Sequence, residues 1–304
     1  MFSNARKFFI TAQHDTTVAD LLRSHLPSGT DVQTVLDSGG VWMDRKRITQ
    51  LDKVITAGLT VVVYVARNQG RRYGVPPEHI VYEDANMIGV YKPAGVTSQS
   101  DRSDMHYNLT AGIANYFRSR GIYYTPPPIN RLDYMVSGIC LYPKHKAAEK
   151  YLFRLTRERA IHKWYWAWLP KQPGLPNCLR VKDTLSHLGK AYLDPSGQPA
   201  HSLFIKQAES EHAVLYSVFI FTGRRHQIRF HAAQYLAPII GDTHYGSTIK
   251  TPDESIALVA YGYNFFYRDK KIRIRLPDRL GRHLIDARHF WAWTIVSGAF
   301  RRSV

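Results

Sequence analysis

Eight short apolar stretches between Ile80 and Pro277 have the length and composition of β-strands. They read IVYE, MIGVYK, SGICLY, HKWYWAW, SLFIKQ, HAVLYSVFIF, IALVAYGY and KIRIRL. Three stretches with helical spacing of apolar residues lie among them: LTAGIANYFRSR, AAEKYLFRLTRER and RRHQIRFHAAQYL. Strands outnumber helices, and hairpin-like neighbours recur. We therefore expect an α+β fold with a mixed, largely antiparallel β-sheet flanked by helices.

The segment before Ile80 has the pattern of a separate small α+β domain over residues 1–67. TVADLLRSHL and DVQTVLDSGG predict two short helices, while KFFIT, GVWMDRKRI and TVVVYVA predict strands, two of them in a basic hairpin. NQGRRYGVPPE has two glycines and two prolines without periodicity, which indicates a linker over residues 68–79. A larger domain is expected over residues 80–277, followed by a tail or helix without an assigned role over residues 278–304.

The charge balance favours a polyanionic partner. The 304 residues include 41 Lys+Arg against 24 Asp+Glu, a formal net charge of +17. An anionic membrane is the competing partner, but the longest apolar run, LTVVVYVA, is far shorter than a membrane span. We expect a soluble monomer without a membrane partner.

The cysteines and the N-terminus bear on location. Cys140 and Cys178 form no CxxC pair, which favours a reducing compartment, and we expect the cytoplasm. Met1 to His14 carries two basic residues and no acid until Asp15, a faint likeness to a transit peptide. KFFIT reads as well as a first strand, and we favour the strand.

Several common chemistries lack their sequence signals. The chain has no G-x-S-x-G elbow around Ser137, no phosphate-binding G-x-x-x-x-G-K-[ST] loop and no G-x-G-x-x-G turn. His226 and His231 are five residues apart on a predicted helix, which places them on poorly matched faces for a shared metal ion. We expect no metal site.

Three stretches occur in a fixed order: VYKPAGV, NRLDYMVSGICLYPK and FTGRRHQIRFHAAQYLAPIIGDTHYG. They resemble the segments of the RluA-type RNA pseudouridine synthases, which read K-P-x-G, H-R-L-D-x-x-T-S-G, T-G-R-x-H-Q-I-R-x-H and P-I-x-G-D-x-x-Y-G. The resemblance spans residues 80–277, and Asn130 and Val136 replace the usual His and Thr. LDSGGVWMDRKRITQLDKVITAGLTVVVYV resembles the small RNA-binding module first seen in a ribosomal small-subunit protein, which many members carry. Residues 1–67 are thus the expected RNA-binding domain, with Asp44 where that module usually has Asn.

The resemblance identifies Asp133 as the nucleophile and Arg229 as its ionic partner. Pseudouridine formation breaks the bond from base to sugar, turns the uracil and rejoins it through carbon 5, so no redox cofactor or group donor is needed. Three routes for the aspartate stay open: attack on the sugar carbon, addition to the uracil ring, or removal of a sugar proton. The plain alternative is a surface ion pair between Asp133 and Arg131.

Uridines in structured RNA must leave their stack to be modified. By resemblance, Tyr165 contacts the flipped base and Arg131 fills the vacated space, since a guanidinium both stacks and donates hydrogen bonds. The alternative for Tyr165 is a core position, because its strand is rich in tryptophan. Strand alternation puts Trp164 and Trp166 on the opposite face from Tyr165, which favours a distinct role for the tyrosine.

Further basic residues suggest an RNA-binding track, although each alone is typical of a solvated surface. They are Lys150, Arg154, Arg157, Arg224 and Arg225. The expected function is an RNA pseudouridine synthase that acts on ribosomal RNA, with transfer RNA as the second possibility and the particular uridine left open. A noncatalytic RNA-binding or RNA-folding factor is the main alternative. A base-removing glycosidase would need a second acid near Asp133.

Overall fold

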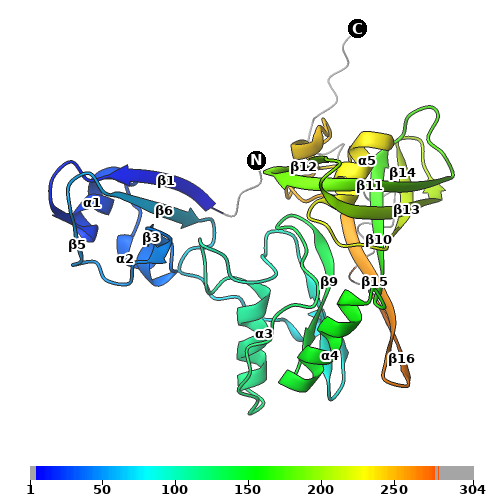
Figure 1. Cartoon of the computed structure of the whole chain (residues 1–304), viewed down its shortest axis with the longest axis horizontal. Helices are drawn as coiled ribbons and strands as arrows, with labels where there is room; N and C mark the ends of the chain where they lie inside the picture. Colours follow the sequence, from blue (N-terminus) through cyan, green and yellow to red (C-terminus); the bar gives the residue numbers. More distant parts are fainter. Residues whose placement is uncertain (1–4, 278–279, 281–304) are drawn as a thin grey trace, which may run out of the picture. The chain divides into compact units, whose positions relative to one another are not determined.

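The computed structural model describes residues 5–277 and 280, so nearly all of the expected C-terminal tail lies outside the described residues. The chain forms two compact units. Residues up to Val75 and the segment Val96–Pro126 form the smaller unit, and Pro76–Gly95 with the residues from Pro127 onward form the larger unit. Figure 1 colours the elements of both units along the sequence.

The smaller unit contains the expected two helices and basic hairpin. Its main sheet has the order β1-β6-β3-β4, and β2 pairs with β5. Thr17 and Asp31 cap the two helices by accepting hydrogen bonds from backbone N–H groups of the first turn. The elements are β1 (Ala5–Thr11), β2 (Thr16–Thr17), α1 (Val18–His25), α2 (Val32–Asp37), β3 (Val41–Met43), β4 (Lys46–Arg47), β5 (Val54–Ile55) and β6 (Thr60–Ala66).

Asp44 and Arg45 form the two-residue turn between β3 and β4. Both have positive φ, 48° and 64°, as a type I′ hairpin turn requires. Asn-Gly is the preferred pair in such a turn, and this chain adopts the same conformation with Asp-Arg. The departure at Asp44 therefore leaves the tight hairpin in place.

Residues 96–126 pack against the N-terminal residues, although the sequence placed them in the larger domain. The backbone N–H of Met105 donates to the Ser38 carbonyl at 3.1 Å, and the Trp42 indole donates to the Arg102 carbonyl at 2.9 Å. Within this segment, α3 (Leu109–Arg118) buries Leu109, Ile113 and Phe117. The predicted boundaries 1–67, 68–79 and 80–277 thus do not coincide with the two compact units.

The larger unit is built on a ten-stranded sheet with the path β12-β11-β13-β14-β10-β15-β9-β8-β7 and β16 beside β15. Among the described strands only β9 and β15 pair in parallel, which confirms the predicted mixed, largely antiparallel α+β fold. The strands are β7 (Ile80–Glu83), β8 (Met87–Lys92), β9 (Ser137–Pro143), β10 (His162–Pro170), β11 (Cys178–Leu188), β12 (Lys190–Leu193), β13 (Gln198–Glu209), β14 (Ala213–Ile220), β15 (Leu258–Tyr267) and β16 (Lys270–Arg275). Short 3₁₀ helices lie at η1 (Pro77–His79) and η2 (Thr243–Tyr245).

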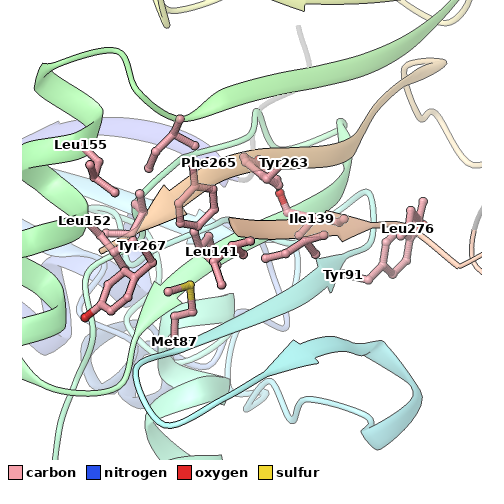
Figure 2. Close-up of a cluster of buried hydrophobic side chains, with 14 of the residues drawn as sticks. Met87, Tyr91, Ile139, Leu141, Leu152, Leu155, Tyr263, Phe265, Tyr267 and Leu276 are labelled. Atoms are coloured by element: carbon pink, nitrogen blue, oxygen red, sulfur yellow. The ribbon is translucent and has the colours of Figure 1, made fainter. Parts of the chain in front are cut away.

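Two helices flank this sheet, α4 (Lys146–Arg157) beside β9 and α5 (Gln227–Tyr235) beside β13 (Figure 1). Leu152 and Leu155 of α4 join a buried cluster with Leu141 and Phe265 from the sheet (Figure 2). Burial of large apolar side chains of this kind stabilises the folded state by about 1.5–3 kcal/mol each. The apolar stripe of α4 therefore fixes it on the sheet, while its charged face stays exposed.

The sequence analysis did not predict β11 or β12, and it placed the start of helix α5 too early. In β11 only Val181 and Leu185 are buried, so the apolar alternation that marks a strand is weak. The predicted helix began at Arg224. Instead, His226 adopts a left-handed conformation with φ 57°, and the helix begins at Gln227.

Candidate active site

Asp133 and Arg229 meet where the loop before β9 approaches α5. Arg229 Nη1 donates to Asp133 Oδ2 at 2.7 Å. The remaining edge of the guanidinium makes two hydrogen bonds to Asp242, Nε to Oδ2 at 2.7 Å and Nη2 to Oδ1 at 2.8 Å. Asp242 is fully buried and Arg229 is 6% exposed, but 28% of the Asp133 side chain is exposed. Asp133 is thus the carboxylate of this group that a substrate can reach.

The surroundings keep Asp133 ionised. Burial by itself raises the pKa of a carboxyl group, but the charge and hydrogen bond of Arg229, together with smaller contributions that include Arg225, lower the pKa of Asp133 below its usual value. The pKa of Arg229 is raised, because its hydrogen bonds to Asp242 and the charge of Asp133 outweigh burial. The site therefore holds a fixed cation beside a carboxylate that is negative at neutral pH.

Gly138 and Lys92 position the Asp133 loop. Gly138 has φ 120°, and a Cβ there would lie 2.4 Å from the backbone N of Ala260, so only glycine allows this approach of β9 to β15. The buried Lys92 ammonium donates to the Tyr134 carbonyl at 3.2 Å and to the Pro93 carbonyl at 2.9 Å. The first two sequence motifs are thus tied together directly beside Asp133.

Asn130, which stands where the family pattern has His, is buried against β9. Its amide donates to the Ile139 carbonyl at 3.2 Å, and its carbonyl accepts the N–H of Leu141 at 2.9 Å. The neighbouring residue Ile129 also binds β9, because its N–H donates to the Leu141 carbonyl. The asparagine fastens the Asp133 loop to the sheet.

His226, which Tyr245 holds in place, makes a second contact with Asp133, and the sequence analysis assigned neither residue to the site. The Tyr245 hydroxyl accepts the N–H of Ala191 at 2.7 Å and lies 3.0 Å from His226 Nδ1. We assign the Tyr245 hydroxyl as the donor to His226 Nδ1. His226 then carries its own proton on Nε2, which lies 3.6 Å from Asp133 Oδ2. The Gly-Asp-x-x-Tyr run in the third motif, which holds both Asp242 and Tyr245, was the available signal.

His226 stays neutral in this arrangement. Burial is the main cause that lowers its pKa to about 3; the Asp133 charge acts in the opposite direction, and the positive charges of Arg229 and Arg225 add to the lowering. The Arg229 guanidinium lies 5.1 Å from the centroid of the Tyr245 ring, a cation–π contact. His226 thus presents an N–H group to Asp133 rather than a second positive charge.

Tyr165 lies on β10 and is 6% exposed. Its hydroxyl is hydrogen-bonded to that of Tyr263, which in turn donates to the Ile139 carbonyl at 2.9 Å. Burial raises the pKa of Tyr165, and the nearby Asp133 charge contributes in the same direction. Trp166 stacks on Tyr261 with ring centroids 4.2 Å apart. The hydroxyl of Tyr165 is thus bound within the sheet, close enough to Asp133 to be influenced by its charge.

The predicted RNA-contacting residues lie on several elements of the larger unit. Arg131 and Arg225 are exposed, and Arg225 is close enough to influence Asp133 electrostatically. Arg224 donates to the Pro199 carbonyl at 3.1 Å, which holds its side chain along β13. The exposed face of α4 carries the other three, Lys150, Arg154 and Arg157.

The two histidines considered as metal ligands have separate partners. His231 Nδ1 lies 2.9 Å from the Ser202 hydroxyl, whereas His226 faces Tyr245 and Asp133. Within residues 5–277 and 280, no group of three or more His, Cys, Asp or Glu side chains is arranged to hold a metal ion. In the same residues, no helix is long and apolar enough to cross a membrane.

Comparison with known proteins places the chain in a family. The model of the RNA pseudouridylate synthase family matches residues 86–234. The ribosomal large subunit pseudouridine synthase C of Vibrio cholerae is 26% identical over 279 residues, which cover 84% of this chain and 86% of that protein. The dual-specificity RNA pseudouridine synthase RluA of Vibrio parahaemolyticus is 27% identical over 202 residues, 63% of this chain and 79% of that protein.

Solved structures agree on the fold. Human RNA pseudouridylate synthase domain containing 1 superposes with a TM-score of 0.53 at 18% identity, covering 66% of this chain and 82% of that one. The fold, the motifs and the relatives define an RNA-modifying isomerase. The chain belongs to the RluA-type family of RNA pseudouridine synthases.

Proposed function

We propose that this protein converts specific uridines of structured RNA into pseudouridine, with Asp133 as the nucleophile. The observation that carries the proposal is the ion pair of Asp133 with Arg229, in which the carboxylate is ionised, oriented and accessible. A binding protein has no need of a carboxylate held charged beside a buried arginine. This favours catalysis over the noncatalytic alternative.

The proposed reaction breaks the bond from uracil nitrogen 1 to the sugar and forms one from carbon 5 to the same sugar carbon. Carbon 5 loses its hydrogen and nitrogen 1 gains one, so atoms and electrons balance without a cofactor. Asp133 can act by any of the three routes considered above. Tyr165 is proposed to contact the flipped uracil, and Arg131 to occupy the space that the base leaves.

Asp242 is a second acid close to the site, yet its placement argues against hydrolysis. Besides Asp133, a base-removing glycosidase needs a second carboxyl group that is free to activate water or to protonate the leaving group. Both oxygens of Asp242 accept hydrogen bonds from Arg229, and the side chain is fully buried. Its proposed role is to hold Arg229 in position, which leaves Asp133 as the single reacting acid.

Ribosomal RNA is the proposed substrate, with transfer RNA as the alternative, and the enzyme is proposed to be a cytoplasmic monomer. One relative is named a ribosomal large subunit synthase and another a dual-specificity RNA synthase, which supports an RNA target in this class. The N-terminal residues 1–67 are proposed to bind RNA. The exposed basic turn residues Arg45 and Lys46 support this role.

The test of catalysis is release of tritium from RNA whose uridines carry tritium at carbon 5. We expect release by the native protein, insensitive to a chelator, and no detectable release by Asp133→Asn, which keeps the shape but loses the charge. Asp269→Asn, an exposed acid on the β15–β16 hairpin, is the matched control and should be fully active. Tight binding of cellular RNA by the native protein without any tritium release would establish the noncatalytic alternative.

The RNA-binding role of the N-terminal residues needs a milder change than deletion, because residues 96–126 pack on them. Charge reversal in the hairpin turn, Arg45→Glu with Lys46→Glu, should weaken RNA affinity while kcat at saturating RNA is retained. Lys271→Glu with Arg273→Glu, exposed on β16, provides a control with the same change in charge. Equal affinity of the two double variants would contradict the proposed role.

A further inference from the structure

The four-stranded sheet of the smaller unit has one face toward its helices and one open face. Val61 and Val63 of β6 point to the helices and lie in the buried core with residues of α1 and α2. On the other face, Phe9 pairs with Val62 and Val62 pairs with Trp42, so these three side chains form a row across β1, β6 and β3. Phe9 is 67% exposed. A contiguous apolar row of this kind marks an interaction site.

Lys7 lies beside two aromatic rings on the open face. It is two residues from Phe9 on β1, and it pairs with Tyr64 of β6. The Lys7 ammonium lies 4.2 Å from the centroid of the Phe9 ring and 5.7 Å from that of the Tyr64 ring, which are cation–π distances. Lys7 forms no ion pair with a carboxylate of the described residues. Its charge therefore stays available to an anionic ligand.

Two arginines add positive charge at the Trp42 end of the row. Arg47 pairs with Trp42 across β3 and β4, and its guanidinium carbon lies 4.7 Å from the centroid of the Trp42 ring. The guanidinium carbon of Arg102 lies 5.6 Å from the same ring. Among the described strand residues that point to this face, none is aspartate or glutamate. The open face therefore complements a polyanion.

Exposed rings beside cations on a β-sheet suit single-stranded RNA. Bases stack on the rings, and phosphates pair with the cations. Four-stranded sheets with exposed aromatic residues hold two or three unpaired bases in this way. Phe9 and Tyr64 are diagonal neighbours across β1 and β6, a relation that spans roughly 7–8 Å. The two rings can thus take two bases of one strand, while Lys7 meets a phosphate between them.

We propose that this sheet face binds an unpaired RNA strand, with bases on Phe9 and Tyr64 and a phosphate on Lys7. The proposal deepens the RNA-binding role proposed for the N-terminal residues and rests on it. The basic turn at Arg45 and Lys46 can attract any RNA through its phosphates. The rings require bases that are not paired, so the sheet face selects RNA that has an unpaired segment.

The first test compares binding of a fluorescent oligouridylate by the full chain before and after the strand is annealed to oligoadenylate. Phe9→Leu, which keeps an exposed apolar side chain, should lower the affinity for the single strand about tenfold, as one lost base stack does, and should leave the affinity for the duplex unchanged. Phe266→Leu, at a ring that is 58% exposed on β15, is the matched control. Equal single-strand affinity of the two variants would overturn the proposal.

A second test examines the phosphate contact and the bases. For the single strand, Lys7→Gln should reduce the slope of log affinity against log salt by about 0.7, whereas Lys271→Gln, exposed on β16, should retain the native slope. Oligouridylate that carries 5-iodouridine should photocrosslink to Phe9 or Tyr64 in the native protein. A native slope in Lys7→Gln, with no crosslink to either ring, would also contradict the proposal.

The same variants separate this proposal from the others. If Arg45→Glu with Lys46→Glu weakens RNA binding but Phe9→Leu and Lys7→Gln do not, the N-terminal role stands and the sheet-face proposal alone fails. If the native protein releases no tritium from any RNA while Phe9→Leu still weakens single-strand binding, the proposed catalysis fails and the sheet-face proposal stands. A native dimer that Phe9→Ser converts to a monomer, with single-strand affinity unchanged, would assign the face to a second copy of the chain and overturn the proposal.

Discussion

Arg229 and Asp242 form a bidentate ion pair inside the larger unit, with both carboxylate oxygens bound within 2.8 Å and neither residue more than 6% exposed. This pairing leaves one nitrogen of the guanidinium, Nη1, to bind Asp133. The orientation of the proposed nucleophile therefore depends on an acid that does not itself contact it.

Asp242→Asn should lower turnover by about 100-fold, because a displaced Arg229 no longer fixes Asp133 in a reactive position. Stability should fall by about 3 kcal/mol, since a buried cation loses its charged partner. Tritium release and urea unfolding measure the two effects, with the exposed Asp269→Asn as control. Full turnover in Asp242→Asn would show that Asp133 needs no such support.

Tyr245→Phe should lower kcat by about tenfold, comparable to the loss of one hydrogen bond, while KM stays near its native value. The substitution removes the hydroxyl that fixes the proton of His226 and leaves the N–H of Ala191 without its acceptor. Single-turnover kinetics provide the measurement. Tyr192→Phe, at an exposed ring on β12, is the matched control. A change in KM alone would assign Tyr245 to RNA binding.

The dependence of activity on pH should show no histidine step. His226 has its pKa lowered to about 3 and is neutral throughout the working range. The pKa of Asp133 in the folded protein is lowered. The carboxylate therefore stays ionised even at the usual carboxyl pKa and is protonated only as pH falls through the lower folded value. Single-turnover rates should be flat from about pH 6 to about pH 8. A break near pH 6.5 would contradict the neutral assignment.

Arg229→Lys provides the comparison for that profile. Lysine keeps a charge but cannot bind Asp242 through two nitrogens and reach Asp133 with a third. The attraction that offsets burial of Asp133 weakens, so the acid limb of the rate profile should move to higher pH. An unchanged limb would mean that Arg229 does not set the ionisation of Asp133.

Lys92 should make stability depend on alkaline pH. Burial lowers its folded pKa from 10.5 to about 8, so between these values the unfolded chain binds more protons than the folded one, and unfolding becomes harder as pH rises. Lys92→Met should remove this component. Urea unfolding at intervals from about pH 7.5 to about pH 10.5 measures the difference between the two proteins. If the stability of the two proteins changed with pH in the same way, the Lys92 ammonium would have to be exposed to solvent.

The sequence was sufficient for the strands of the larger unit that carry clear apolar runs and for the motifs that hold Asp133 and Arg229. It was not sufficient for β11, where only Val181 and Leu185 turn inward. His226 was considered as a helical metal candidate, because a left-handed residue before a helix leaves no mark in apolar periodicity.

The association of residues 96–126 with the N-terminal unit was also missed. It depends on contacts such as that of Met105 with Ser38, between backbone groups far apart in the chain, whose partners no local pattern specifies. Asp242 escaped notice for the same reason: its proximity to Arg229 follows from the tertiary fold, although both belong to one motif.

The ion pair of Arg229 and Asp133 joins residues 96 positions apart, with β9, β10, β11, β12, β13 and β14 between them. Contacts of such long sequence separation form only after a large loop has closed, so they appear late in folding. In a newly made chain we therefore expect the ion pair that orients Asp133, the proposed nucleophile, to form only when the central strands have assembled. On the proposed function, partly folded molecules that already bind RNA would be unable to modify it until these strands are in place.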